Sequence, residues 1–288
     1  MKIPSIIRLD GEFSESISAI RESLNSTNPL PTVINGLSGG AEDAYLSEAI
    51  REITTGGTPV LVLVPSDAER HRVFEYLRGE GIRAMEYKPR DLVFYNISAS
   101  CDIDRERLSV LHAIISGECD AVVSTPSAAA LYTMPREVLR ESVVALRAGD
   151  EIAPMALADK LILMGFVRVD MVEAAGQFSV RGDIFDIWHC SESHPVRVEF
   201  FGDEIDRVAY FNAETQRSLE VADLITVLPV REGIITPESR ERVISQIKRL
   251  LKKCTDSDSA AKLEYELSTV EANLILNSRD KYINAIYR

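Results

Sequence analysis

The sequence predicts an α/β protein in which a parallel-sheet domain is interrupted by a smaller α+β domain. Three observations support this prediction. The first part of the chain alternates short apolar runs with amphipathic stretches, as strands and helices of a parallel sheet do. From residue 166 to residue 211 the pattern contains only strands, and a strand and a helix return after residue 214. A length of 288 residues is also long for one compact core, so two domains are expected.

The first segment of the α/β domain is expected to span residues 1–134. Residues 60–64 form a continuous apolar run, which is typical of a strand covered on both faces, and Pro65 ends it. Ser66 or Asp67 can then cap a helix that runs to Gly79. The predicted strands are 32–35, 60–64, 82–87 and 121–124, and the predicted helices are 41–53, 67–79 and 105–115.

The inserted α+β domain is expected to span residues 135–214, and the returning segment of the α/β domain residues 215–288. A predicted helix over 154–164 ends at Gly165 as its C-cap. The alternating strands that follow predict a sheet with one solvated face. Residues 225–228 are expected to return to the first sheet, and Thr236 to cap the next helix. The strands predicted in the insert are 166–170, 177–181, 184–188, 196–201 and one through 208–211.

Composition excludes several classes of protein. Acidic residues outnumber basic ones, 45 to 32, and the net charge of −13 opposes general binding of polyanions. The four cysteines lie far apart without a CxxC pair, so neither a disulfide framework nor a zinc site is expected. No apolar run approaches the roughly 20 residues of a membrane span, and the first residues lack a signal-peptide core. We therefore expect a cytoplasmic protein with no metal site, no catalytic residues and no membrane contact.

The sequence GLSGGAED lies between a predicted strand and a predicted helix, where a Walker A loop would hold nucleotide phosphates. Gly36, Gly39 and Gly40 are present in this loop. However, Glu42 replaces the lysine that reaches the outer phosphates, and Asp43 replaces the hydroxyl that holds magnesium. Two carboxylates repel a nucleotide, and both suit the first turn of a helix. We interpret the segment as a degenerate phosphate loop that caps a helix; weak nucleotide binding is the alternative.

Alternation within two predicted strands places Arg168 and Arg181 on the solvent side of the sheet, with Ser179 beside them. If residues 173–176 form the turn, an antiparallel hairpin puts Arg168 directly opposite Arg181. Such a pair either binds carboxylates of a partner or has an internal acidic neighbour between them. Phe185 is either an apolar anchor beside the pair or a core residue. The internal acids available are Asp170, Glu173 and Asp183.

The string GQFSVRGDIFDIW, followed by PVRVEFFGDEIDRVAYFNAETQRS, closely resembles a stretch shared by UvrB-type excision-repair proteins and transcription-repair coupling factors. The likeness extends more loosely over GLSGG, the helix predicted near 105–117 and AVVSTPSAAALY. UvrB proteins keep the Walker A lysine where this chain has Glu42. They also carry a long aromatic DNA-clamping hairpin where this chain has a short segment with Phe94 and Tyr95. These departures, and QRS at 216–218, favour the coupling factors.

The resemblance implies a RecA-like, P-loop-NTPase-like domain with an insert, in the manner of UvrB domains 1a, 2 and 1b. It implies a region that has lost ATPase activity and recruits the damage-scanning protein UvrA. The family's UvrA-contacting arginines fall on Arg168 and Arg181, and a third falls on Ser179. RNA polymerase, DNA, ATP and magnesium would be bound by other parts of the full-length protein. We therefore expect a non-catalytic adaptor without a cofactor; an ATP-dependent UvrB-like helicase fragment and a direct DNA-binding module are the alternatives.

Overall fold

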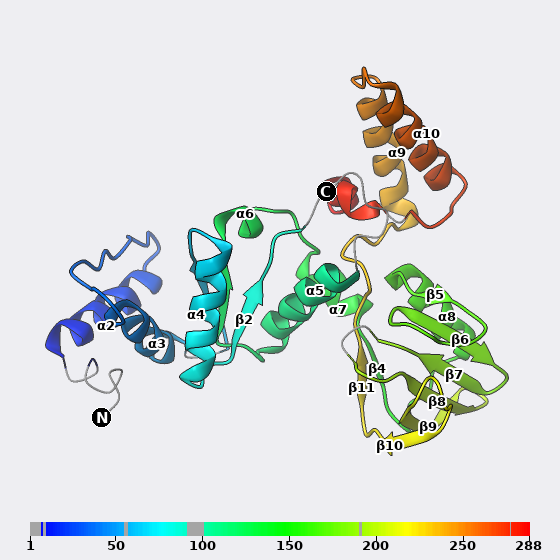
Figure 1. The fold of residues 1–288 in the computed structure, drawn as a ribbon, viewed down its shortest axis with the longest axis horizontal. Helices are drawn as coiled ribbons and strands as arrows, with labels where there is room; N and C mark the ends of the chain where they lie inside the picture. The colour runs from blue at the N-terminus through cyan, green and yellow to red at the C-terminus, as the bar shows by residue number, and fades with distance from the viewer. Residues whose placement is uncertain (1–6, 8–9, 55–56, 91–100, 190–191, 277) are drawn as a thin grey trace. The chain divides into compact units, whose positions relative to one another are not determined.

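The computed structural model describes residues 7, 10–54, 57–90, 101–189, 192–276 and 278–288, and the predicted segment with Phe94 and Tyr95 lies outside them. The chain divides into two compact units (Figure 1). Unit 1 comprises residues 1–89 and 110–131, and unit 2 comprises residues 90–109 and 132–288.

Unit 1 is built on a three-stranded parallel sheet in which β3 (Ala121–Ser124) lies between β1 (Val60–Leu63) and β2 (Ala84–Tyr87). Ala121 is in register with Val60 on one side and Ala84 on the other. These strands and the helices α3, α4 and α5 agree with the sequence prediction to within a few residues, whereas α2 and α6 were not predicted. The helices of this part of the chain are α2 (Gly11–Leu24), α3 (Ala41–Ile53), α4 (Asp67–Gly79), α5 (Cys101–Ser116) and α6 (Pro126–Ala129).

Helices pack on both faces of the central strand β3. Val60 and Val123 pack with Ile50 of α3 and Leu77 of α4, whereas Val122 belongs to a separate cluster formed with α5. This two-sided burial holds for the central strand β3, whereas Leu61 and Leu63 of β1 are 55% and 51% exposed, so the expectation that residues 60–64 are covered on both faces is wrong for β1. The predicted cap of α4 is confirmed, since the Ser66 side chain accepts a hydrogen bond from the Glu69 N–H at 3.2 Å.

The strand predicted at residues 32–35 is absent. This segment is exposed and takes part in no sheet of the described chain. A β-branched run has a strong tendency to form a strand only where a neighbouring edge and a buried face are available. The sheet observed in unit 1 therefore has three parallel strands, which establishes the α/β class but not a RecA-like sheet.

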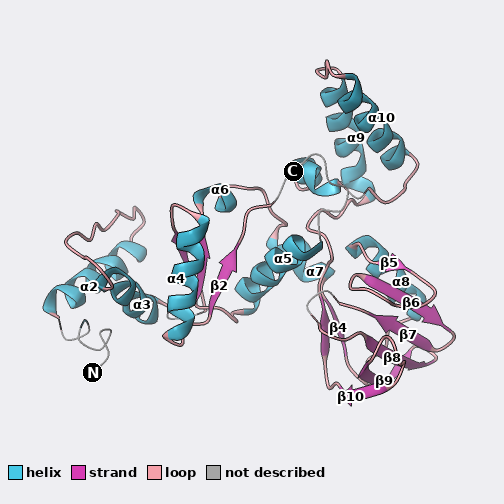
Figure 2. Cartoon of the chain, in the orientation of Figure 1, coloured by secondary structure: helices cyan, strands magenta, loops and turns pink. Residues whose placement is uncertain are grey.

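Unit 2 contains a six-stranded sheet in the order β10-β9-β8-β7-β6-β5 (Figure 2). Neighbouring strands are antiparallel, except that β5 runs parallel to β6. The sequence predicts most of these strands correctly, because polar and apolar residues alternate along them. The strands are β5 (Val167–Arg168), β6 (Gln177–Arg181), β7 (Ile184–Ile187), β8 (Val196–Phe201), β9 (Glu204–Phe211) and β10 (Ser218–Val221).

The helix α8 (Pro154–Met164) packs on one face of the six-stranded sheet. Its buried Leu157 and Leu161 belong to the same apolar cluster as Phe178 and Val198 of the strands. Gly165 ends the helix in the left-handed conformation with a φ of 98°, so the predicted glycine C-cap is confirmed. We call the opposite side of the sheet the outer face.

The strand predicted at 225–228 does not return to the first sheet. β11 (Ile225–Val227) instead pairs antiparallel with β4 (Val144–Leu146), and both strands bury side chains in the cluster beneath α8. The reason is packing: Ile225 and Val227 fill the core of unit 2. The boundary expected near Glu214 consequently falls inside this unit, and β10, which follows it, pairs with β9.

The last part of the chain is helical. Thr236 and Ser239 form a capping box at the start of α9, as the Thr-Pro sequence predicts. Val243 and Ile247 of α9 pack against Val270 of α10 in a further apolar cluster. Among the helices that the structure describes, none has the length and apolar character to cross a bilayer. The remaining elements are α7 (Arg136–Ser142), α9 (Pro237–Leu251), α10 (Ser257–Glu271), η1 (Arg279–Tyr282) and α11 (Ile283–Ile286).

Candidate partner-binding surface

A buried carboxylate organises the arginines on the outer face of the sheet. Asp186 of β7 is only 1% exposed and is in register with Ser179 of β6 and Arg197 of β8. It accepts a hydrogen bond from Nη2 of Arg181 at 2.6 Å, and bonds from Nε and Nη2 of Arg197 at 2.7 and 2.9 Å. One carboxylate therefore fixes two guanidinium groups.

The two arginines differ in their surroundings. Arg197 is fixed further by Gln216, whose Oε1 lies 2.8 Å from Nη2, and by the ring of Phe211, whose centroid lies 4.4 Å from its guanidinium carbon. The hydrogen bonds to Asp186 raise the pKa of Arg197 above its ordinary value. The Arg181 side chain remains 43% exposed. Arg181 is thus oriented by Asp186 and still reaches solvent.

The predicted pairing of Arg168 with Arg181 is wrong. β5 is parallel to β6, and Arg168 is in register with Phe178 rather than with Arg181. Phe178 faces α8, so the alternation of side chains along a strand puts Arg168 and Arg181 on opposite faces of the sheet. Arg168 is exposed at the sheet edge. The segment between β5 and β6 is therefore a crossover between parallel strands and not a hairpin turn.

Two other predicted surface residues are buried. Ser179 lies on the outer face as the alternation predicts, but it is 1% exposed, and its hydroxyl has no hydrogen-bond partner among the described residues. Phe185 is fully buried and belongs to the core, with its ring centroid 5.5 Å from that of Phe178 and 6.3 Å from that of Phe200. A residue in this position cannot contact a partner, so the reading of Phe185 as a surface anchor is wrong.

The glycine-rich loop has the turn expected of it, and two carboxylates follow it in the first turn of α3. Gly36 and Gly39 adopt positive φ angles of 87° and 61°, and Gly40 precedes α3 without a side-chain cap. Glu42 is exposed in the first turn of α3, and the carboxylate of Asp43 forms an ion pair with Arg72 of α4. This pair raises the pKa of Arg72. Within the described residues, no three or more His, Cys, Asp or Glu side chains are placed to hold a metal ion.

A second charged cluster, which the sequence did not predict, lies buried in unit 2. Glu232 is fully buried and accepts hydrogen bonds from Nε of Arg107 at 2.5 Å and from the hydroxyl of Thr133 at 2.6 Å. Arg231 forms an ion pair with Asp104 at 2.9 Å. Burial raises the pKa of Asp104 to about 7, and nearby carboxylates act in the same direction. No sequence spacing relates these residues, because the partners lie 99 to 127 positions apart.

Comparisons with known proteins agree with this architecture. Residues 144–232 match the family described as the UvrB interaction domain, and this range runs from β4 through β11. The transcription-repair-coupling factor of Bacillus subtilis is 31% identical over 248 residues, which are 85% of this chain and 20% of the relative. That of Myxococcus xanthus is 32% identical over 54% of this chain and 13% of the relative.

A UvrABC system protein B from Methanococcoides burtonii is 26% identical over 84% of this chain and 39% of its own length. The chain thus spans about a fifth of the coupling factor that it matches over most of its residues, and about two fifths of this UvrB relative. These matches confirm the resemblance that the sequence motifs predict. Residues 144–232 thus match the UvrB interaction domain, and the chain is similar over most of its length to a transcription-repair-coupling factor.

Proposed function

We propose that this chain is a non-catalytic adaptor that recruits UvrA during transcription-coupled nucleotide excision repair. The observation that carries the proposal is the UvrB interaction domain at residues 144–232, which contains both Arg168 and Arg181. Similarity to proteins named transcription-repair-coupling factor supports the link to transcription. RNA polymerase would be contacted by other parts of a longer protein.

Arg181 is the residue that we assign to the contact with UvrA. Its Nη2 is bonded to Asp186, and the half-exposed guanidinium has further N–H donors for a carboxylate of a partner. Asp186 acts as a positioning residue, because a side chain that is already oriented loses less entropy on binding. Arg168, at the edge of the same sheet, would contribute a separate contact from the other face.

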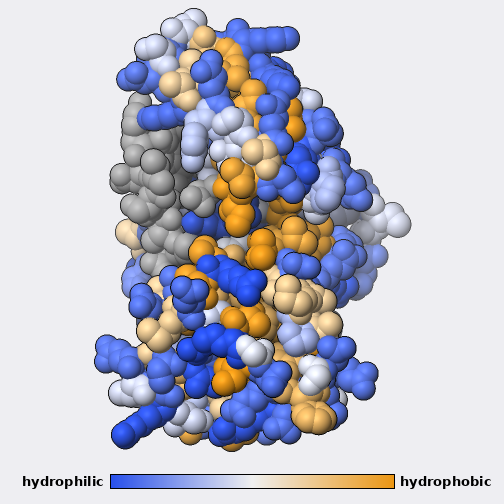
Figure 3. Space-filling view, turned by 90° about the vertical axis from the view of Figure 1, so that its right-hand side faces the viewer, coloured by the Kyte–Doolittle hydropathy of each residue, from blue (hydrophilic) through white to orange (hydrophobic). Residues whose placement is uncertain are grey.

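The surface around these arginines is of mixed polarity. Val167 is 55% exposed beside Arg168, and Ile184, the register neighbour of Arg181, is 36% exposed. Figure 3 shows one side of the molecule, where hydrophobic residues lie among hydrophilic ones. Interfaces that combine arginine with small apolar areas are common in non-obligate complexes.

The absence of catalysis is part of the same proposal. Glu42 stands where the Walker A lysine would neutralise phosphate charge, and Asp43 is engaged by Arg72. Glu42 repels a polyphosphate, and the ion pair with Arg72 leaves Asp43 engaged within the protein instead of holding a metal ion. They favour the adaptor over an ATP-dependent UvrB-like helicase fragment, and no cofactor is required for the adaptor role.

The test is a binding titration of purified UvrA against the chain and its Arg181→Gln variant. We expect the variant to bind about tenfold more weakly or worse, because a hydrogen bond to a charged group contributes about 1.5–3 kcal/mol. Glutamine is preferable to glutamate, since a carboxylate at position 181 would lie beside the buried Asp186 and destabilise the fold. Thermal unfolding of Arg181→Gln should change little, because Arg197 still pairs with Asp186.

Arg140→Gln, an exposed substitution on α7 in the same unit, is the matched control and should bind UvrA like the original chain. If the original chain does not bind UvrA at all, the adaptor proposal fails. If Arg181→Gln and Arg140→Gln bind equally well, the adaptor can stand, but the assignment of Arg181 is wrong.

A further inference from the structure

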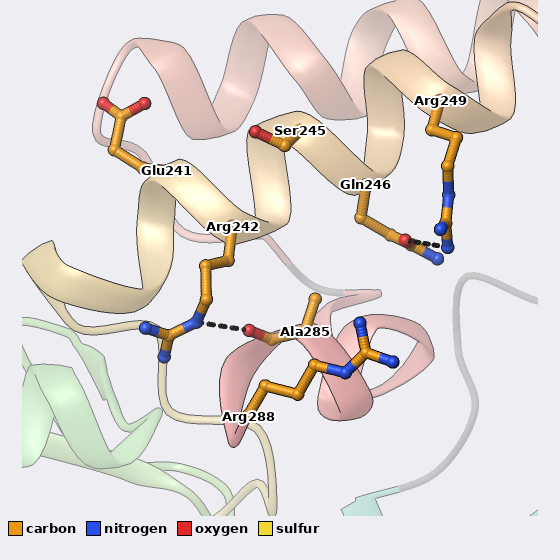
Figure 4. Close-up of a pocket in the computed structure, with 7 residues that line it drawn as sticks. All are labelled: Glu241, Arg242, Ser245, Gln246, Arg249, Ala285 and Arg288. Carbon is orange, nitrogen blue, oxygen red and sulfur yellow. Dashed lines mark hydrogen bonds between the residues drawn. The ribbon is translucent and has the colours of Figure 1, made fainter.

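A groove lined by arginines lies between α9 and the last residues of the chain, apart from the surface assigned to UvrA. Its volume is about 360 Å³. Figure 4 shows that α9 forms one wall and the segment from Ala285 to Arg288 the other. The residues that line it are Glu241, Arg242, Ser245, Gln246, Arg249, Ala285 and Arg288.

The polar groups on the walls are mainly donors. Arg242 is fixed at the base of the groove, because Nε donates to the carbonyl oxygen of Ala285 at 3.0 Å and Nη2 to that of Ile286 at 2.8 Å. Arg249 donates to Oε1 of Gln246 at 2.5 Å, which leaves the Gln246 amide N–H groups as donors. Arg288 makes no hydrogen bond or ion pair with the described part of the chain. Glu241 is the one acidic side chain in the lining.

The local charge is opposite to that of the whole chain. Residues 236–254 contain six basic and two acidic side chains, whereas the chain carries −13. Lys248 forms an ion pair with Glu271 of α10 at 2.8 Å, so its charge does not contribute to the groove. Arg242 and Arg249 recur at helical spacing on one side of α9, and Lys253 follows just beyond the last residue of this helix.

We propose that this groove binds successive phosphate groups of a nucleic acid strand. Three arginines against the single carboxylate of Glu241 favour an anion, and planar guanidinium groups match phosphate oxygens. Seven residues of helix separate Arg242 from Arg249, or about 10 Å along the axis at a rise of about 1.5 Å per residue. Phosphates of one strand advance by about 3.4 Å each, so this spacing suits a run of phosphates better than one small anion.

The test is fluorescence anisotropy of a labelled single-stranded 20-mer and of its duplex, titrated with the 288-residue chain. We expect binding in about 50 mM salt that weakens roughly tenfold in about 200 mM, the loss that two or three phosphate contacts predict. Arg249→Glu should weaken binding by about tenfold or more. Arg240→Glu is the matched control, because it makes the same charge change on the opposite side of α9, where Arg240 contacts Asn273.

The proposal is overturned if the chain binds neither probe in low salt, or if the two variants lose equal affinity. Poly-glutamate and unlabelled DNA are then compared as competitors of the labelled DNA. The proposal is also overturned if poly-glutamate displaces the labelled DNA at the same concentration as unlabelled DNA does, since the groove would then bind acidic peptides. Both variants should keep the original unfolding temperature, which excludes a loss of fold. Arg249→Glu should retain UvrA binding, so that this test is independent of the adaptor proposal.

Discussion

The Asp186 carboxylate shows how a single residue decides what an arginine can do. A buried carboxylate without partners is strongly unfavourable, and here Arg181 and Arg197 both donate to it. Arg181 consequently has an acidic companion within its own sheet, and this companion is Asp186 rather than one of the three acids that the sequence offered. It is an oriented donor and not an uncompensated positive charge.

Asp104 should make the stability of unit 2 depend on pH. Its folded pKa of about 7 exceeds the ordinary value of 3.8, so the folded state holds the proton more tightly than the unfolded chain does. Stability is therefore expected to fall as the pH rises from about 4 to about 7, by roughly a few kcal/mol in total. In Asp104→Asn this fall should disappear. Urea unfolding at several pH values within this window measures the difference.

Asp159→Asn, at an exposed carboxylate of α8, is the control for this measurement. Its unfolding free energy should follow that of the original chain at every pH. If Asp104→Asn also follows the original chain, Asp104 does not carry the raised pKa. Arg231, the ion-pair partner of Asp104, is present in the original chain and in both variants. The comparison therefore isolates the titration of the Asp104 carboxyl.

At the scale of elements, the sequence predicts where helices and strands occur better than how they pair. Apolar alternation locates β6, β8 and β9, and cap residues locate the ends of α4, α8 and α9. The direction of β5 does not follow from alternation, because parallel and antiparallel neighbours show the same pattern. The misplaced pairing of Arg168 with Arg181 results from that ambiguity.

The N-terminus of α3 is expected not to bind ATP. Helix N-termini attract phosphate, but Glu42 and Asp43 place negative charge in the first turn of this one. About 1 mM MgATP should therefore shift the unfolding temperature of the chain by less than about 1 °C, since only a ligand that binds the folded state stabilises it. Differential scanning fluorimetry measures the shift. A rise of several degrees that is lost in Gly39→Val would contradict the prediction.

At the scale of the molecule, the division of the chain into two units depends on contacts between distant residues, and these contacts cannot be predicted from local sequence. The α/β fold class and the many strands of the inserted domain can be predicted from the spacing at which apolar residues recur along the sequence. The pairing of β11 with β4 joins residues about 80 positions apart, and nothing local in the sequence distinguishes it from a return to the first sheet. The Glu232 cluster is equally invisible, because charged residues normally predict solvent exposure.

The part of unit 2 that matches the UvrB interaction domain is expected to fold and to bind UvrA on its own as residues 143–232. The buried members of its apolar cluster all lie between Val144 and Val230, so the excised piece keeps its core. A piece of this size exceeds the roughly 55–65 residues at which many domains fold alone. Glu232 would lose Arg107 but gain water, and a solvated carboxylate needs no buried partner.

We expect the 143–232 fragment to unfold in one cooperative thermal transition by circular dichroism and to bind UvrA within about threefold of the 288-residue chain. Arg181→Gln in the fragment should weaken binding by the same factor as in the chain. If the fragment shows no cooperative transition, residues 143–232 need contacts with other parts of unit 2 in order to fold. A folded fragment that fails to bind UvrA would place the contact outside the UvrB interaction domain, since all its surface residues would then be present and insufficient.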